Sequence, residues 1–443
     1  MITDHSVFQF RRSYFPGIRI GLETMQNFME ELENPHLQYP RVLVAGTNGK
    51  GSTANFLSSL VNFCGKKTGL YTSPHLMGLN ERFKINGSSI SDQDLLDYLK
   101  VLENLSKKKN LKLTFFEMTT ALSQKYFKDQ NVDLAILEVG MGGRWDATHL
   151  GPFVCNILTM ISMDHMDYLG HSLVEIASEK AATISPGGTV ISDRQAKDSL
   201  EVIQKEVKRK GATLFLNGRD FNLTRKGDYF EFHFLSKALF RFPLLDLPSY
   251  QENNLSLALA SFSFLMAMDQ HMSNPFELDF ISKAIQKTSL LGRFQFLENP
   301  EYLKAKVLLD GAHNPSGMKA LVNSLKQRGI AANKLHFILG VKSDKDWRAL
   351  LKEIPKGLAS ISLIEGKAAG DQGAIQFISS NDLRKEVLRL GISSKENIRT
   401  FHSIIEAYRS VINKLGDQHW LVLTGSLYLL GEFLCHYKNN WRT

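Results

Sequence analysis

RVLVAGTNGKGSTANFLSSLVNFC, residues 41–64, is the stretch of sequence that decides the fold. The apolar, β-branched run at residues 42–44 predicts a buried strand, and the glycines that follow predict a tight turn. A helical pattern comes next. We expect this helix to begin at Ser52 or Thr53, because both side chains are good N-caps. The stretch therefore predicts a strand–loop–helix unit.

The turn inside this unit has the chemistry of a phosphate-binding loop. Backbone N–H groups of a glycine-rich turn can close on phosphate oxygens, and the following helix adds partial positive charge. Lys50 can reach the β- and γ-phosphates, and Ser52 can cap the helix and face a phosphate or a metal. The general Walker A spacing is not matched, because Gly46 precedes Gly49 too closely. An ordinary glycine-rich turn therefore remains the alternative.

Strands and helices alternate on both sides of this unit. Residues 134–139, 155–161 and 189–192 predict strands, and residues 92–105, 119–127 and 250–269 predict helices. This alternation is typical of a mainly parallel sheet with helices on both faces. The pattern changes at residues 214–242, where polar and apolar residues alternate around glycine-containing turns. That segment predicts a small antiparallel appendage.

A second α/β series follows a junction near Gln295. Gly292, Asn299 and Pro300 interrupt the pattern there, so we expect two domains, residues 1–296 and 297–443. In the second domain we predict strands at residues 306–310, 335–340, 360–364 and 420–424, and helices at residues 315–327, 382–390 and 427–437.

Composition narrows the class of protein. The chain has 443 residues, 43% of them hydrophobic, which is typical of a globular protein with an ample core. Its three cysteines form no CxxC pair, which argues against a disulfide framework or a zinc finger. No apolar run reaches the roughly 18 residues of a membrane span, and the first residues do not resemble a signal peptide, so we expect a soluble cytoplasmic protein. The net charge of +8 predicts an anionic partner, and at this point nucleic acid, a membrane surface and a small anionic substrate all stay open.

Further polar residues follow the predicted strands. Glu138 ends one strand, and Asp164 and His165 follow another. Ligands bind outside the carboxyl ends of strands in open α/β sheets, so Glu138 is a candidate Mg²⁺ ligand, with a turn-capping carboxylate as the alternative. A lone histidine such as His165 is more often structural than a metal ligand. Asp310 and His313 follow a strand of the second domain, and Arg293 at the junction could contact a phosphate.

Taken together, these segments resemble the folylpolyglutamate synthase / dihydrofolate synthase family, a branch of the Mur ligase superfamily. The matching segments occur in the family's order and span nearly the whole chain: GIRIGLETMQNFMEELENPH (17–36), VAGTNGKGST (44–53), YTSPHL (71–76), ERFKING (81–87), TFFEMTT (114–120), LEVGMGGRWDAT (137–148), MDHMDYLG (163–170), IASEKA (176–181), YQENNLSLA (250–258), LLGRFQ (290–295), LLDGAHNP (308–315), LGVKSDKD (339–346) and LTGSLYLLGE (423–432). The shortened phosphate loop is this family's own form. The resemblance implies a Mur-ligase-like, P-loop ATPase N-terminal domain with folate-binding loops and a C-terminal Rossmann-like glutamate-ligase domain.

The resemblance also implies a reaction. ATP phosphorylates a carboxylate of a reduced folate or dihydropteroate, and the amine of L-glutamate then displaces phosphate from the acyl phosphate. Cations are needed because the carboxylate and the γ-phosphate are both anions. The implied partners are therefore small molecules, with ATP and two Mg²⁺ sites and without nucleic acid or membrane. Members of the family are commonly monomers. The anionic substrates also account for the basic excess of the chain.

Roles can be carried over position by position from the family. The resemblance implies that Lys50, His165 and Lys180 are catalytic, and that Ser73, Glu138, His165 and Lys180 hold metal. Lys180 matches a lysine that is carbamylated in family members, which turns a cation into an oxygen ligand. The residues expected on the nucleotide are Thr47, Asn48, Gly49, Lys50, Gly51, Ser52, Asn254, Arg293, Asp310 and His313.

The sequence departs from the family pattern in two places, and the choice of acceptor stays open. Ala182 stands where the family usually has glycine, and His149 where it usually has asparagine. Both lie beside a motif, so the departures concern local loop geometry. The stretch at residues 10–19 has aromatic and basic residues suited to a pterin ring and a carboxylate, and packing of its apolar side chains is an equal alternative.

Two other functions fit parts of the sequence. A Mur-type cell-wall amino-acid ligase usually has Gly-Lys-Thr in the phosphate loop, whereas Lys50 is followed here by Gly51 and Ser52. A basic, nucleic-acid-binding ATPase would explain the charge, but the sequence has no recognisable RNA- or DNA-binding motif.

Overall fold

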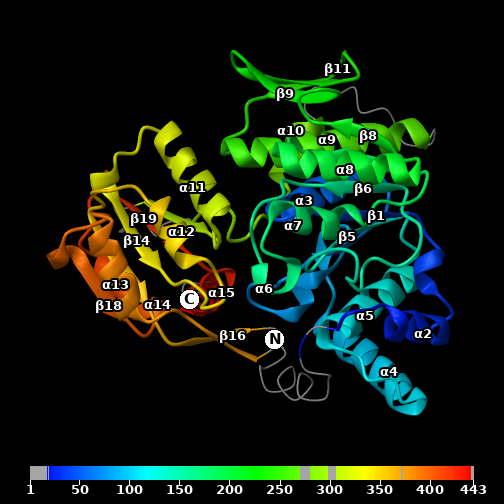
Figure 1. The fold of residues 1–443 in the computed structure, drawn as a ribbon, viewed down its shortest axis with the longest axis horizontal. Coiled ribbons are helices and arrows are strands. Elements are labelled where there is room, and N and C mark those ends of the chain that lie inside the picture. The colour runs from blue at the N-terminus through cyan, green and yellow to red at the C-terminus, as the bar shows by residue number, and fades with distance from the viewer. Residues whose placement is uncertain (1–16, 18, 270–279, 298–305, 371–372, 441–443) are drawn as a thin grey trace. The chain divides into compact units, whose positions relative to one another are not determined.

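The structure is a computed structural model that describes residues 17, 19–269, 280–297, 306–370 and 373–440. Contacts divide the chain into two compact units. The first contains Met1–Ser162 and Met166–Ser289, and the second contains Leu290–Thr443 together with the three-residue segment Met163–His165. The predicted boundary after Phe296 stays a prediction about functional domains. Figure 1 shows the elements of both units as ribbons.

The first unit is built on an eight-stranded sheet with the order β4-β3-β2-β5-β1-β6-β7-β8. Six of these strands run parallel, and β3 and β4 form an antiparallel edge. Every residue of the central strands β1 and β5 is buried, as expected of parallel strands covered on both faces. The strand bounds are β1 (Arg41–Ala45), β2 (Thr68–Tyr71), β3 (Phe83–Ile85), β4 (Ser88–Ser89), β5 (Leu134–Glu138), β6 (Cys155–Leu158), β7 (Thr189–Ser192) and β8 (Thr213–Leu216).

Helices cover this sheet, as the alternating pattern predicts. Helix α3 packs on β1, β2 and β5 and against α9, while α5 packs on β2 with α2 and α4 as further neighbours. The bounds are α2 (Glu23–Glu31), α3 (Lys50–Phe63), α4 (Asp92–Lys109), α5 (Phe115–Asp129), α6 (Met166–Leu169), α7 (Leu173–Ala181), α8 (Lys197–Lys210), α9 (Ser249–Met268) and α10 (Phe280–Gln286). In the part of the chain that is described, no helix is long and apolar enough to cross a membrane.

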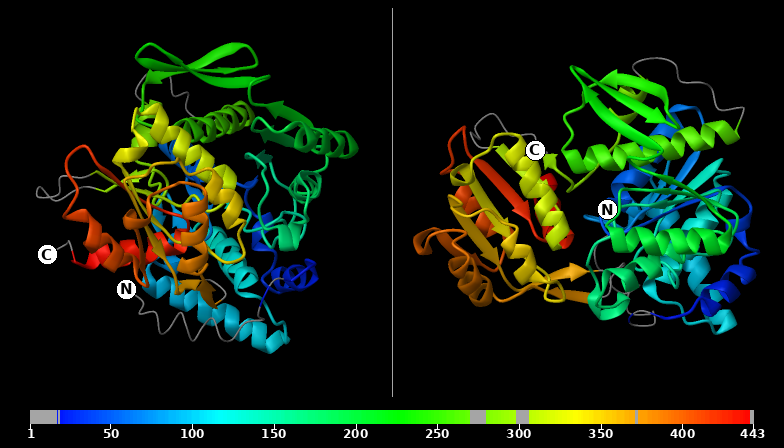
Figure 2. Two further views of the ribbon diagram at one scale, coloured as in Figure 1. Left: turned by 60° about the vertical axis from the view of Figure 1, so that its left-hand side comes forward. Right: turned by 45° about the horizontal axis from the view of Figure 1, so that its top comes forward.

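The predicted antiparallel appendage is present, with one correction. Strands β9 (Phe221–Lys226), β10 (Tyr229–Phe234) and β11 (Lys237–Pro243) form a three-stranded antiparallel sheet that stands apart from the large sheet (Figure 2). Phe240 of this sheet packs against Phe262 of α9, with the two ring centroids 6.1 Å apart. The start of the predicted segment was assigned wrongly, because β8 pairs in parallel with β7. A half-buried edge strand alternates in the same way as a hairpin strand, so the pattern could not separate them.

A second correction concerns the start of α3. The helix begins at Lys50, not at Ser52 or Thr53. Gly49 is the N-cap residue and has a φ of 91°, a backbone conformation that favours glycine. The left-handed glycine ends the loop abruptly, so the helix needs no hydroxyl cap, and both hydroxyl residues lie buried inside it.

The second unit is a six-stranded sheet with the order β12-β13-β19-β14-β15-β18. All strands are parallel except β12, which pairs antiparallel with β13. The bounds are β12 (Gln295–Phe296), β13 (Lys306–Asp310), β14 (Leu335–Leu339), β15 (Ser360–Ile364), β18 (Ile398–Phe401) and β19 (Trp420–Thr424), with a separate hairpin of β16 (Lys367–Gly370) and β17 (Gly373–Gln376). The helices are α11 (Pro315–Gln327), α12 (Trp347–Lys352), α13 (Ser380–Arg389), α14 (Ile404–Ile412) and α15 (Leu427–Asn440). The predicted strands and helices of this half are confirmed to within a few residues.

Candidate active site

The glycine-rich loop between β1 and α3 is shaped by two close contacts. A Cβ on Gly46 would lie 1.9 Å from the hydroxyl oxygen of Thr159, and a Cβ on Gly49 would lie 2.2 Å from Oδ1 of Asn254. Both glycines also have positive φ, at 143° and 91°. The loop therefore requires glycine at both positions, and Asn254 lies directly against it.

The loop is anchored to the segment that follows β6. The backbone N–H groups of Thr47 and Asn48 donate to the carbonyl of Met160, at 3.0 and 3.3 Å. The Thr47 hydroxyl donates to the carbonyl of Ser162 at 3.0 Å and accepts from its N–H at 3.1 Å. These bonds fix the first half of the loop. The N–H groups of the first turn of α3 have no carbonyl partner within the helix. They are therefore the donors that could bind an anion at this loop.

Lys50 and Ser52 lie where the sequence analysis expects a phosphate contact, at the loop and the first turn of α3. The Lys50 ammonium donates back to the carbonyls of Gly46 and Thr47, at 3.3 and 3.1 Å. Ser52 is buried, and its hydroxyl accepts from Nε2 of Gln251 at 3.2 Å. Gln251 was missed by the sequence analysis, although it lies inside the quoted segment YQENNLSLA.

Gln251 also orients Asn254. The carboxamide oxygen of Gln251 accepts from Nδ2 of Asn254 at 3.0 Å, and both side chains come from α9. Helix α9 therefore presents a polar pair to a loop that is nearly two hundred residues earlier in the sequence.

The predicted metal ligands Ser73 and Glu138 come together. Glu138 ends β5 in register with Val44 of β1, just before the glycine-rich loop. Its Oε2 accepts from the backbone N–H of Ser73 at 3.0 Å, and Ser73 follows the neighbouring strand β2. Glu138 is buried. A carboxylate and a hydroxyl residue thus meet at the carboxyl edge of the sheet, which fits the oxygen ligands that Mg²⁺ prefers.

The loop that carries Ser73 is pinned by two residues of its own turn. The Glu81 carboxylate accepts from the N–H groups of Leu76, Met77 and Gly78, at 2.8, 3.0 and 3.2 Å. Arg82 is fully buried and donates from Nε to Nδ1 of His75 at 3.0 Å. The ERFKING segment therefore serves the loop of the YTSPHL segment.

A second glycine-rich loop, residues 140–146, packs on α7 beside Lys180. A Cβ on Gly143 would lie 2.6 Å from the carbonyl of Glu179, and Arg144 donates from Nε to the Glu179 carboxylate at 2.9 Å. Lys180 is 4% exposed. Burial of an ammonium is costly, and this is the property of the site that bears on the expected carbamylation of Lys180.

The two departures from the family pattern are accommodated locally. Ala182 has a φ of −58°, an ordinary helical value, so the position does not require glycine. The His149 ring lies with Nδ1 3.1 Å from the carbonyl of Arg144, which ties it to the second glycine-rich loop. Burial lowers the pKa of His149, so this ring is neutral.

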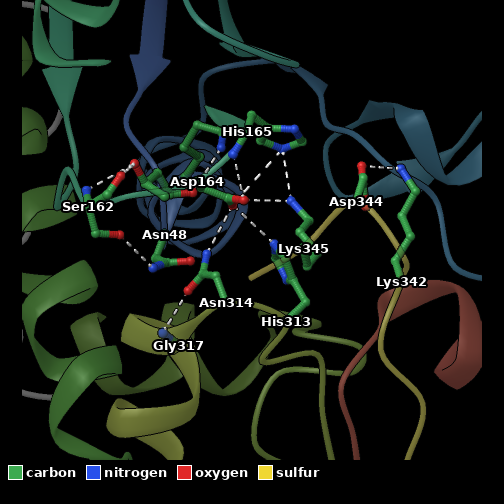
Figure 3. Close-up of polar contacts among 12 residues, drawn as sticks. Asn48, Ser162, Asp164, His165, His313, Asn314, Gly317, Lys342, Asp344 and Lys345 are labelled. Atoms are coloured by element: carbon green, nitrogen blue, oxygen red, sulfur yellow. Dashed lines mark hydrogen bonds and ion pairs between the residues drawn. The ribbon is translucent and has the colours of Figure 1, made fainter. Parts of the chain in front are cut away.

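In the second unit, Asp164 makes polar contacts with several side chains (Figure 3). Its Oδ1 accepts from Nζ of Lys345 at 2.6 Å, and its Oδ2 accepts from Nδ2 of Asn314 at 3.0 Å. Nε2 of His313 lies 3.5 Å from Oδ2. Burial raises the pKa of Asp164, but His313, Lys345 and His165 together hold it far below its usual range. Asp164 is therefore an ionised carboxylate, and neither it nor Lys345 was among the predicted site residues.

His165 has an unusual backbone and a cationic neighbour. Its φ is 51°, and its N–H donates to Oδ1 of Asp164 at 2.9 Å. Its Nε2 lies 3.3 Å from the Lys345 ammonium. A metal ion would compete with that ammonium at Nε2.

Asp310 holds the two segments on which Arg293 and His313 lie. Its Oδ2 accepts from the N–H of Phe294 at 2.9 Å, and its Oδ1 accepts from the N–H of Ala312 at 3.0 Å. The His313 ring is fixed through Nδ1, which lies 2.8 Å from the carbonyl of Gly311. The three residues therefore gather at the end of β13. Among the described residues there is no group of three or more His, Cys, Asp and Glu side chains arranged to hold a metal.

The phosphate-loop geometry, the mainly parallel sheet and the second α/β unit define a Mur-type ligase. The Mur ligase middle domain model matches residues 44–261, and the model for the C-terminal domain of dihydrofolate synthetase matches residues 294–436. The chain belongs to the folylpolyglutamate synthase / dihydrofolate synthase family of ligases.

The matches to related proteins extend over nearly the whole chain. Folylpolyglutamate synthase of Lacticaseibacillus casei is 28% identical over 411 residues, which is 90% of each chain. Dihydrofolate synthase/folylpolyglutamate synthase of Bacillus subtilis is 29% identical over 431 residues, which is 94% of each chain. The solved structure of Mycobacterium tuberculosis folylpolyglutamate synthase, complexed with ADP and AMPPCP, matches with a TM-score of 0.83 and 27% identity, over 98% of this chain and 97% of that chain. The folate branch, not the cell-wall branch, is therefore the one this chain resembles throughout.

Proposed function

We propose that this chain catalyses the ATP-dependent addition of L-glutamate to reduced folates, with dihydropteroate as a second candidate acceptor. The observation that carries the proposal is the position of Glu138. This buried carboxylate lies in register with Val44, beside the glycine-rich loop, and accepts from the N–H of Ser73. A phosphate loop and a metal-binding carboxylate on adjacent parallel strands are what a nucleotide-dependent ligase needs.

The reaction has two steps. A folate carboxylate oxygen attacks the γ-phosphorus of ATP, and ADP leaves, which gives an acyl phosphate. The amine nitrogen of glutamate then attacks the acyl carbon, loses a proton and displaces inorganic phosphate, which leaves an amide. No covalent bond to the enzyme is required. The protein's task is to bring anions together and to stabilise the charge that develops.

The glycine-rich loop and α3 are proposed to bind the phosphates. Residues Thr47, Asn48, Gly49, Lys50, Gly51 and Ser52 form this site. The first turn of α3 supplies N–H donors and the positive end of the helix dipole. Lys50, which donates to the loop carbonyls, is proposed to transfer its hydrogen bonds to the phosphate oxygens. Asn254, which lies against Gly49, is proposed to set the shape of this pocket.

Two Mg²⁺ sites are proposed. Ser73 and Glu138 would hold the first ion, which when bound would neutralise charge on the phosphates. His165 and a carbamylated Lys180 would hold the second. The carbamate forms when the neutral Nζ amine adds to carbon dioxide and releases a proton, which produces oxygen ligands. The burial of Lys180 supports this, because a neutral amine is the reactive form.

Residues of the second unit are proposed to contribute further contacts to the nucleotide. Arg293 would contact the phosphates, and Asp310 and His313 would lie near the ribose and base. The Asp310 carboxylate accepts one backbone N–H at each oxygen, from Phe294 and Ala312, which orients it at the end of β13. We further propose that residues 1–296 bind ATP and folate and that residues 297–443 complete the ligase, in a cytoplasmic monomer that binds neither nucleic acid nor membrane. The predicted pterin stretch at residues 10–19 lies outside the described residues except for Gly17 and Arg19.

The test is formation of ADP by the purified full-length chain. The assay contains ATP, Mg²⁺ and L-glutamate, with tetrahydrofolate in one series and dihydropteroate in another. We expect ADP formation that requires both glutamate and an acceptor. Activity with one acceptor or with both decides between one and two ligase activities. ADP release that does not depend on glutamate would refute the proposal.

A further inference from the structure

The second unit contains a carboxylate with four polar neighbours and no assigned role. Asp164 is 8% exposed and contacts Lys345, Asn314, His313 and the backbone N–H of His165. We propose that Asp164 is a positioning residue of the ligase site, which fixes His165 and His313 through one carboxylate while Asn314 and Lys345 hold that carboxylate in place. This inference rests on the proposed function, because it takes the roles of the two histidines from it.

Asn314 can present only its amide nitrogen to Asp164. Its Oδ1 accepts from the N–H of Gly317 at 2.8 Å, which makes Asn314 the N-cap of α11. A flip of the carboxamide would break this cap, so Nδ2 stays directed at Oδ2 of Asp164 (Figure 3). The beginning of a 13-residue helix thus orients a donor toward the carboxylate.

Lys345 holds the other oxygen. The side chains of Lys345 and Asp164 are each 7% exposed, and their charged atoms are 2.6 Å apart. A buried ion pair of this kind is sensitive to the loss of either partner, because the remaining charge has no water to replace it. Each Asp164 oxygen thus accepts from a donor of its own, Oδ1 from Lys345 and Oδ2 from Asn314.

The two histidines depend on the carboxylate in different ways. The Asp164 carboxylate accepts the backbone N–H of His165, whose φ of 51° is uncommon for a residue other than glycine. The His313 ring contacts the Gly311 carbonyl through Nδ1 and faces Asp164 through Nε2, so the protein holds both ring nitrogens. Loss of the carboxylate therefore releases a backbone in one case and a ring in the other.

The substitution D164N keeps the shape of the side chain and removes its charge. The new amide cannot accept from Lys345 and Asn314 at once, because one of its two polar ends is a donor. N314D alone would place two carboxylates against each other. The double variant D164N/N314D restores a donor–acceptor pair between the two positions, and aspartate is as good an N-cap as asparagine. It therefore repairs the packing without returning a carboxylate to position 164.

The experiment measures the melting temperature, kcat, the KM for ATP and the Mg²⁺ activation constant of the full chain and these variants. D344N is the matched control, since it breaks the exposed Lys342–Asp344 pair on the same loop, whose atoms are 2.7 Å apart. We expect D164N and N314D to melt lower and the double variant to recover. We expect D164N and the double variant alike to show at least a tenfold higher KM for ATP or Mg²⁺ activation constant, and D344N to behave like the wild type.

Full recovery of both constants in the double variant would overturn the inference, because it would reduce Asp164 to a packing role. An active wild type with an unchanged D164N would do the same. Imidazole ¹⁵N NMR of His313 supplies a readout without activity: D164N should shift this signal and D344N should not. An unshifted His313 signal in D164N overturns the inference even if the wild type forms no ADP. A wild type that forms no ADP, together with the expected shift in D164N, refutes only the proposed function.

Discussion

The backbone N–H of Ser73 donates to Oε2 of Glu138 at 3.0 Å, although the two residues are 65 positions apart in the sequence. They meet because β2 and β5 are neighbours in the parallel sheet and each residue lies at or just beyond a carboxyl end. This edge is where open α/β sheets bind ligands. The contact orients the Glu138 carboxylate.

Replacement of Glu138 by glutamine tests this site. The carboxamide of E138Q can still accept from the N–H of Ser73, so the fold should be retained. Loss of the charge should lower kcat by roughly 10²-fold or more, since a bound cation contributes several kcal/mol to charge stabilisation. Binding of Mn²⁺ followed by electron paramagnetic resonance should weaken in parallel. A variant that binds Mn²⁺ as tightly as the wild type would remove Glu138 from the metal site.

The glycine at the start of α3 gives a second prediction. In G49A the new Cβ meets Oδ1 of Asn254 at 2.2 Å and sits on a backbone with a φ of 91°. We expect a loss of about 2–5 kcal/mol of unfolding free energy from strain and overpacking together, and a higher KM for ATP. Denaturant unfolding and nucleotide titration measure the two effects.

Gly65 is the matched control for this substitution. It has a φ of 80°, and a Cβ added there would meet nothing within 4 Å. G65A should therefore lose only the conformational term, about 1–2 kcal/mol, with normal affinity for ATP. Equal losses in the two variants would mean that contact with Asn254 does not shape the loop.

Lys180 gives a spectroscopic prediction. Protein prepared with ¹³C-bicarbonate should show a carbamate carbon signal that is absent from K180A. K180A should lose roughly 10²-fold or more in kcat, because an oxygen ligand of the metal site disappears, and short carboxylic acids should restore part of the activity. K180R keeps a cation and cannot supply the carbamate, so its kcat should fall as that of K180A does. Wild-type protein with full activity and no carbamate signal would contradict this assignment.

The stability of the first unit should depend on pH through protonation of His36. Burial, together with the neighbouring Arg41 guanidinium, lowers the pKa of His36 to about 4. The unfolded chain, with an ordinary pKa of about 6.5, then binds more protons than the folded chain between these values. The stabilisation is present above pH 6.5 and is lost as the pH falls toward 4.

Urea unfolding at pH 7.5 and pH 5 checks this expectation. H36Q cannot titrate, so its unfolding midpoint should fall less between the two pH values than that of the wild type. His402 provides the control, because its side chain is 82% exposed, and H402Q should follow the wild type. Identical pH dependence of the unfolding midpoint in H36Q and the wild type would show that His36 takes up no proton on unfolding between pH 7.5 and pH 5.

Much of the fold could be predicted from local sequence because hydrophobic periodicity and turn residues agree along the chain. The strand Lys306–Asp310 and the helix Pro315–Gln327 have the predicted bounds. The start of α3 and the pairing of β8 were not predictable in this way. The first depends on a left-handed glycine, and the second depends on which neighbour a strand finds in the sheet.

The residues of the candidate site also fall into two groups, those that local sequence could predict and those that it could not. Residues that follow strands, such as Glu138 and Ser73, could be proposed because parallel strands align their carboxyl ends. Asp164, Lys345 and Gln251 were missed, because their importance depends on contacts between residues that are 150 or more positions apart in the sequence. Each nevertheless lies inside a segment that carries the family resemblance, and that is the signal that could have indicated them.

The most direct measurement of the central claim follows one oxygen atom. A folate labelled with ¹⁸O in its terminal carboxylate is incubated with the enzyme, ATP, Mg²⁺ and L-glutamate, and phosphate and folate products are analysed by mass spectrometry. An acyl-phosphate ligase transfers one carboxylate oxygen to phosphate, so we expect singly ¹⁸O-labelled phosphate in step with folate that has gained a glutamate. Unlabelled phosphate, or phosphate release without a glutamate-extended folate, would contradict the account.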